Sequence, residues 1–301
     1  MATKRWNEFG PMVRDHLGTA RVWVRKWYPW LGTLAVALFC VGAWYSFRNL
    51  GVSLSELKVG PLLALLALAP VTIVYSGTGL WLLARSARTS IPLSRATTIS
   101  TFATVAEALP LPGGAIVRAS ALMAVGTGAG ESSMLVILSA VIWISVAFLA
   151  CGVALMNHGH ALAAILGLGG FAGVAASFSW LLWRAGLSNA LFSLAHRVAG
   201  LVLIGVRLQF AFLSLGVSLP WGDAMPFALA SVAGSAAAIA PAGLGVTELL
   251  AAMIAGSVSI APAAAFIASG IDRIVALGAS GLYALATVGI ERARQAADAP
   301  E

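Results

Sequence analysis

Charged side chains are scarce in this chain. Asp, Glu, Lys and Arg make up only 10% of its 301 residues, and hydrophobic residues make up 60%. Soluble globular domains carry about 25% charged residues, so this composition excludes an ordinary soluble protein. The mean hydropathy of +0.93 points the same way. We therefore predict an all-α membrane protein that crosses the bilayer several times.

Cysteine and the common catalytic patterns are also nearly absent. The two cysteines, Cys40 and Cys151, fall in apolar runs, which excludes a disulfide framework and a zinc-type cysteine spacing. The segment Gly126–Gly130 is rich in glycine but lacks the Lys-Ser/Thr that follows in a phosphate loop. His158 and His160 have no third ligand nearby and fit a short outer turn better than a metal site. We therefore expect no enzyme activity, no cofactor and no metal.

Acidic residues are fewer than basic ones, with 11 Asp and Glu against 18 Lys and Arg, which gives a net charge of +7 and a pI near 10.1. The basic residues lie at the amino terminus and in short loops between apolar runs, so they indicate the positive-inside pattern rather than nucleic-acid binding. We expect a bacterial inner-membrane protein with both termini in the cytoplasm. Its parts are a basic segment at residues 1–29, a membrane domain at 30–291 and a short tail at 292–301.

Long apolar runs are abundant, and six of them are long enough to cross a ~30 Å hydrocarbon core. An amphipathic stretch, Leu187–Val198, is predicted to run along the interface into the fifth span. The predicted spans are Trp30–Phe47, Gly60–Leu83, Ser132–Met156, Ala161–Trp183, Ala199–Leu219 and Pro262–Ile290.

Two further apolar regions are interrupted by Pro and Gly, at Pro110–Gly114 and at Pro241–Gly245. Broken helices persist at membrane depth only where protein or a wet cavity surrounds them. Each region therefore predicts a re-entrant hairpin of two short helices. The helical pieces are Ser94–Leu109 with Ala115–Val125, and Ala224–Ile239 with Val246–Ala255.

The two breaks coincide when the sequence is shifted by 130 residues, which aligns Gly113 with Gly243 and Met123 with Met253. The second span runs inward and the fifth runs outward, so the two hairpins should enter from opposite sides. This predicts an inverted repeat over residues 60–156 and 190–290, an architecture typical of transporters.

Ionisable residues at membrane depth are few and balanced, with three acids and three bases. Each costs about 2.5–3.5 kcal/mol in a lipid-facing position, so we expect them to face inward and pair. Our hypothesis is that Arg118, helped by Arg207, attracts an anionic lipid headgroup, and that the acids balance these bases or accept a cationic headgroup or a proton. The alternative is that the pairs only hold helices together. This applies above all to Asp272 and Arg273, because the side chains of consecutive residues point in different directions. The candidate substrate-binding residues are Glu107, Pro112, Gly113, Gly114, Arg118, Arg207, Pro241, Gly243, Gly245, Glu248, Asp272 and Arg273.

The motifs Leu109–Ala119 and Pro241–Glu248, followed by Ile271-Asp272-Arg273, resemble the lysylphosphatidylglycerol synthase transmembrane-region family. The first motif departs from the family form, which has Asp where this chain has Ala115, and Val141–Ser145 lacks the acid and Arg often found there. The resemblance implies a stand-alone flippase-like membrane domain that binds and translocates phospholipid, polyprenol-linked or hopanoid-type lipids. It does not imply aminoacyl transfer.

We therefore expect a lipid-binding permease. Two alternatives stay open: a transporter of a small polar solute, and a non-transporting partner that anchors a lipid- or glycan-biosynthetic enzyme. Membrane lipids are the expected partners, with a homodimer as a further alternative.

Overall fold

The computed structural model describes residues 33, 36–51, 54–107, 113–159, 161–236 and 243–297, with only the backbone for 291–297. These residues form helices and connecting turns, and no strand occurs among them. The predicted basic segment at 1–29, together with Pro112 and Pro241, lies outside the described residues. Within them the prediction of an all-α protein is confirmed.

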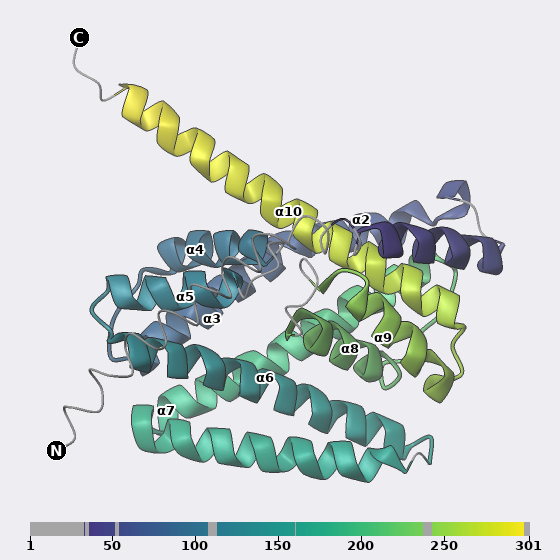
Figure 1. Ribbon diagram of the computed structural model, residues 1–301, viewed down its shortest axis with the longest axis horizontal. Coiled ribbons are helices and arrows are strands. Elements are labelled where there is room, and N and C mark those ends of the chain that lie inside the picture. Colours follow the sequence, from purple (N-terminus) through teal and green to yellow (C-terminus); the bar gives the residue numbers. More distant parts are fainter. Residues whose placement is uncertain are drawn as a thin grey trace.

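A helix at residues 36–50 comes first, and Figure 1 shows the labelled helices that follow it. In chain order they are η1 (Leu54–Glu56), α2 (Val59–Ala67), α3 (Ala69–Ser86), α4 (Leu93–Ala106), α5 (Gly113–Ala124), α6 (Ala129–Met156), α7 (Leu162–Ser214), α8 (Ala224–Ala236), α9 (Val246–Ala255), η3 (Gly256–Val258) and α10 (Pro262–Ala297).

Four of the described helices are long and apolar enough to cross a membrane: Val59–Ser86, which joins α2 and α3, then α6, α7, and Pro262–Ile290 of α10. Large apolar side chains cover their outer surfaces; Trp183 is 81% exposed and Leu285 is 72% exposed. Such surfaces would be unstable in water and suit lipid contact. Four helices of this length and composition suggest a membrane protein, while the count of six spans stays a prediction.

Helix α7 differs from the sequence-based expectation. It is 53 residues long, and Gly186 interrupts it with φ 82° and ψ 166°, a conformation that is essentially restricted to glycine. The chain reverses direction there, so that two arms, 162–185 and 187–214, run antiparallel (Figure 1). The predicted stretch Leu187–Val198 does run into the predicted fifth span, and the second arm continues without a break from residue 187 to Ser214.

The two predicted helix pairs are present. Helix α4 packs against α5, and α8 packs against α9. Their arms approach closely at glycine: a Cβ on Gly113 would collide with the Ala106 carbonyl oxygen, and a Cβ on Gly243 would collide with the Gly234 carbonyl oxygen. Two helix hairpins are thus formed where the breaks were predicted.

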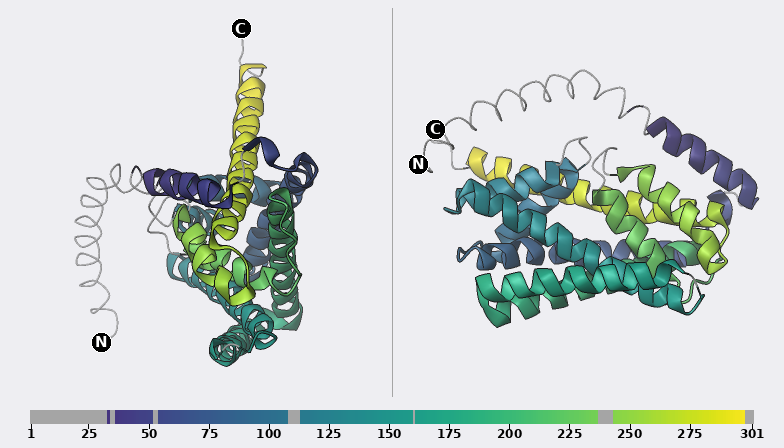
Figure 2. Two further views of the ribbon diagram at one scale, coloured as in Figure 1. Left: turned by 90° about the vertical axis from the view of Figure 1, so that its right-hand side faces the viewer. Right: turned by 60° about the horizontal axis from the view of Figure 1, so that its bottom comes forward.

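The two halves of the chain contact each other reciprocally. Helix α6, from the first half, packs against α8, and α10, from the second half, packs against α4. The hairpins lie toward opposite ends of the molecule, with α4 and α5 at one end and α8 and α9 at the other (Figures 1 and 2).

We call the first of these the basic end, because arginines gather there at the end of α3, the start of α4 and the end of the first α7 arm. They are Arg85, Arg88, Arg95 and Arg184. The opposite end, called the turn end, contains the α6–α7 turn, where His158 Nε2 lies 2.8 Å from Asp223 Oδ1.

Two apolar clusters hold these helices together. The larger lies between α6, α7 and α8 and continues into α9 and α10; it includes Phe212 and Phe227, whose ring centroids are 5.0 Å apart. The smaller joins α3, α4, α5 and α6 near the basic end through Leu80, Leu122 and Leu135. The candidate charged site lies among these packed elements.

Candidate functional site

The most deeply buried charge is Glu248, in the first turn of α9. Its side chain has no exposed surface, and its Oε2 accepts a hydrogen bond of 2.6 Å from the Gly245 backbone N–H. Gly245 precedes α9 with φ 83°, a left-handed conformation that favours glycine. The break therefore turns the carboxylate back onto its own helix start, where free N–H groups favour an anion.

Arg273 of α10 is the partner of Glu248. Its Nε lies 3.3 Å from Glu248 Oε1, and its Nη2 donates a hydrogen bond to Thr247 Oγ1. The guanidinium also lies against the break, since a Cβ on Gly243 would come 3.1 Å from Nη1. Larger residues at the predicted glycine positions 243 and 245 would disturb this contact or strain the backbone.

Asp272 points to a different helix and pairs with Arg207 of the second α7 arm. Arg207 Nη2 lies 2.8 Å from Asp272 Oδ1 and also donates to the Asp272 carbonyl oxygen at 3.1 Å. Both side chains are nearly buried, with relative exposures of 8% and 10%. Asp272 and Arg273 thus connect α10 to α7 and to α9, as their adjacency predicted.

The third pair, Glu107 with Arg118, belongs to the first hairpin and is more exposed. Arg118 Nη1 lies 3.0 Å from Glu107 Oε1, and about a third of each side chain is accessible. Gly114 makes room for this pair, because a Cβ there would collide with Glu107 Oε1. Glu107 also contributes to the electrostatic environment of Arg273, which links this pair to the buried ones.

All six predicted charges therefore face protein and pair one to one, as expected. The expected cooperation between Arg118 and Arg207 is not seen in these contacts, because each guanidinium is paired with a carboxylate of its own. Two buried carboxylate oxygens, Glu248 Oε1 and Asp272 Oδ1, face the guanidinium groups of Arg273 and Arg207.

A second polar cluster was missed by the sequence interpretation, which placed the stretch Leu187–Val198, and with it His196 and Arg197, at the membrane interface. The structure places them inside the bundle. His196 Nε2 lies 2.9 Å from the Tyr75 carbonyl oxygen, and the two rings stack with centroids 4.1 Å apart. Arg197 Nη2 donates to Ser139 Oγ, and its Cζ lies 5.6 Å from the centroid of the Trp143 ring.

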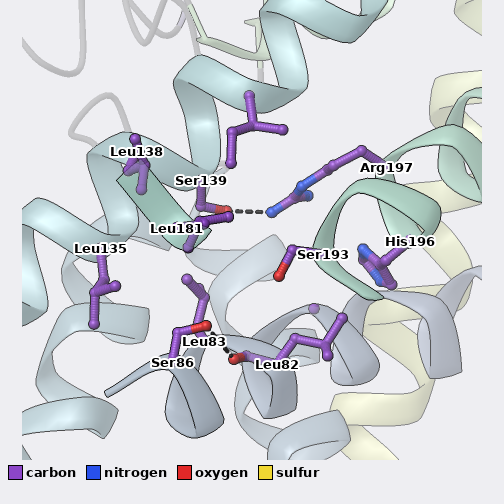
Figure 3. Close-up of a pocket in the computed structure, with 12 residues that line it drawn as sticks. Leu82, Leu83, Ser86, Leu135, Leu138, Ser139, Leu181, Ser193, His196 and Arg197 are labelled. Atoms are coloured by element: carbon purple, nitrogen blue, oxygen red, sulfur yellow. Dashed lines mark hydrogen bonds between the residues drawn. The ribbon is translucent and has the colours of Figure 1, made fainter. Parts of the chain in front are cut away.

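A cavity adjoins this cluster between α3, α6 and both arms of α7 (Figure 3). Its polar lining consists of Ser86, Ser139, Ser193, His196 and Arg197. One signal in the sequence pointed to it: no Gly or Pro separates residue 187 from Arg197, so a single helix was free to continue past both charged positions.

Among the described residues, no group of three or more His, Cys, Asp or Glu side chains is placed to hold a metal ion. No protein-family model and no curated protein matches this chain. The resemblance to the lysylphosphatidylglycerol synthase transmembrane-region family therefore stays a prediction that rests on the two break motifs.

Proposed function

We propose that this protein is a lipid-binding permease that translocates an anionic or modified lipid without covalent chemistry. In this proposal the chain crosses a bacterial inner membrane six times, and its two hairpins re-enter the bilayer from opposite sides. Support comes from the reciprocal packing of α6 on α8 and of α10 on α4, which an inverted repeat would produce.

The proposed orientation places the basic end in the cytoplasm. Four arginines lie at that end, whereas the turn end has the pair of His158 and Asp223. Positive residues in short loops favour the cytoplasmic side. The turn between α6 and α7 would then face the outside.

The observation that carries the proposal is the buried double pair of Glu248 with Arg273 and Asp272 with Arg207. Apolar residues of similar volume in place of a buried ion pair often leave a protein equally stable or more so, so stability alone does not account for four charges at the break. In a membrane protein, ionisable groups at this depth are typical of a substrate path.

The three pairs differ in accessibility, which suggests an order of events. An anionic headgroup meets the partly exposed Arg118 first and competes with Glu107 for its guanidinium. The exchange of ion-pair partners then extends to Arg273, because both Glu107 and Glu248 act electrostatically on its guanidinium. A headgroup ammonium or a proton neutralises the carboxylate that is left behind.

The test is a proteoliposome assay of fluorescent phosphatidylglycerol translocation, with the fluorophore quenched from outside. The double variant Glu248→Met/Arg273→Met removes the pair without leaving an unpaired charge, so it is expected to fold and to lose transport at least tenfold. The control is Glu131→Met/Arg184→Met, which removes the ion pair at the basic end and should transport as the wild type does. A folded Glu248→Met/Arg273→Met variant with the wild-type rate would contradict the proposal.

A further inference from the structure

Arg197 differs from the six paired charges, because no described carboxylate lies within ion-pair distance of it. Its guanidinium is held instead by two residues one turn apart on α6, the Ser139 hydroxyl and the Trp143 ring. The groups that act on its charge are the Tyr75 phenol, which is uncharged near pH 7, and the positively charged Arg118. The cluster therefore carries an excess positive charge inside an apolar bundle.

An unbalanced charge in such surroundings is costly unless an anion neutralises it. The fixed parts of an anion site are present. The guanidinium has donors in a planar fork, and the Ser139 hydroxyl, which accepts from Arg197, keeps its own proton free to donate. The side chains of Ser139, Ser193 and Arg197 lie around the same space in Figure 3.

The cavity lies toward the basic end. The cavity is lined by the last turns of α3, up to Ser86, and by Leu181 near the end of the first α7 arm. Arg85, next to Ser86 at the end of α3, is exposed and provides positive charge at this end. A tetrahedral oxyanion suits this cavity better than a flat carboxylate does, because hydrogen-bond donors come from α6 and α7 on more than one side.

We propose that the cavity between α3, α6 and α7 binds a phosphate group through Arg197, Ser139 and Ser193. The phosphate comes from a lipid headgroup or from free phosphate, and the chemistry of recognition is the same for both. The site is separate from the Glu248 and Asp272 pairs. The lipid source rests on the proposed function; the phosphate site itself does not.

The experiment measures ligand-induced shifts in the melting temperature Tm of the full chain, purified in an uncharged detergent. The probes are dihexanoyl phosphatidylglycerol and sodium phosphate, with dihexanoylglycerol and sodium chloride of equal ionic strength as blanks. A ligand that binds only the folded state raises Tm with concentration. We expect the phosphatidylglycerol probe to raise Tm, and Arg197→Gln to weaken its Kd at least tenfold.

The matched control is Arg184→Gln, which removes an arginine at the same end of the bundle whose charge is already paired with Glu131. It should bind within twofold of the wild type. A shift with both probes supports a phosphate site open to soluble anions, and a shift with the lipid alone supports a headgroup site.

The proposal would be overturned if neither probe shifted Tm, or if the probes shifted the Tm of Arg197→Gln as much as that of the wild type. If Arg197→Gln does not fold, Ser139→Ala decides, because it keeps the arginine and should still weaken binding several-fold. Binding is measured without transport, so failure here leaves the permease proposal standing, and failure of the transport assay leaves this site standing.

Discussion

At the scale of single residues, the charges inside this chain fall into two kinds. Six of them have partners, and the most buried, Glu248, is held by both Arg273 and its own helix start. Arg197 is held by a hydroxyl and an aromatic ring. Removing one partner of a buried pair leaves an unpaired charge, whereas removing Arg197 takes an unpaired charge away, so the two kinds of site should respond differently to substitution.

Replacement of Glu248 alone should be severe. Glu248→Gln leaves the Arg273 charge buried without a counter-charge, which costs about 3–5 kcal/mol when one partner of a buried pair is removed. Glu131→Gln, in the half-exposed pair with Arg184, should cost about 1 kcal/mol or less. Thermal denaturation in detergent measures both. Equal losses in the two variants would show that burial does not set the cost.

Residues of the charged site were predictable, and their partners were not. Glu107, Arg118, Arg207, Glu248 and Asp272 stand out in an apolar sequence, because few charges occur near them. Which acid meets which base depends on packing between helices far apart in the chain. His196 and Arg197 were misplaced for the same reason: their depth follows from the path of α7, which the composition of their neighbours does not reveal.

At the scale of elements, α6 and the first arm of α7 make a close backbone contact. A Cβ on Gly152 would collide with the backbone of Gly167, and a Cβ on Gly170 would collide with the backbone of Leu149. Small residues at such positions let membrane helices approach closely. This interface is therefore sensitive to a single methyl group.

Gly152→Ala should separate these two helices and lower stability by roughly 1–3 kcal/mol, as overpacking does. Gly169→Ala lies on the same α7 arm, where a Cβ would meet no atom within 4 Å, and should be neutral or gain up to about 1 kcal/mol from higher helix propensity. Paired Tm measurements test the contrast. A fall in Tm for Gly169→Ala as large as that for Gly152→Ala would refute the close-packing explanation.

Element boundaries followed the sequence well where apolar runs end in clear breaks. The predicted span Ser132–Met156 corresponds to α6 at Ala129–Met156, and the predicted piece Val246–Ala255 is α9. In the α7 region, the predicted end of the fourth span at Trp183 lies close to the reversal at Gly186. The sequence did not identify Gly186 itself as the reversal, because it resembles the many other glycines of the chain.

At the scale of the whole molecule, the uneven distribution of arginine gives an orientation that can be tested. In a Cys40→Ser background, Arg88→Cys places a thiol at the basic end and Asn157→Cys places one at the turn end; both native side chains are exposed. A membrane-impermeant maleimide should label residue 157 in intact spheroplasts and residue 88 only after permeabilisation. The reverse pattern would invert the proposed topology.

The global arrangement was only partly predictable. The paired helix breaks and their spacing of 130 residues indicated a duplicated architecture, and the two hairpins are present. The contacts of α6 with α8 and of α10 with α4 were not evident, because long-range packing leaves little trace in an alanine-rich sequence.

That reciprocal packing has a consequence for biosynthesis. Helix α4 is made early, but its partner α10 begins roughly 150 residues later, which at about 5–20 residues per second leaves it uncovered for roughly 10–30 s. During that interval the first hairpin has only its own half of the chain, with Arg118 beside Glu107, to shelter it. The packing of α4 is therefore complete only after α10 has been synthesised, so the two halves of the chain reach their final fold together rather than one after the other.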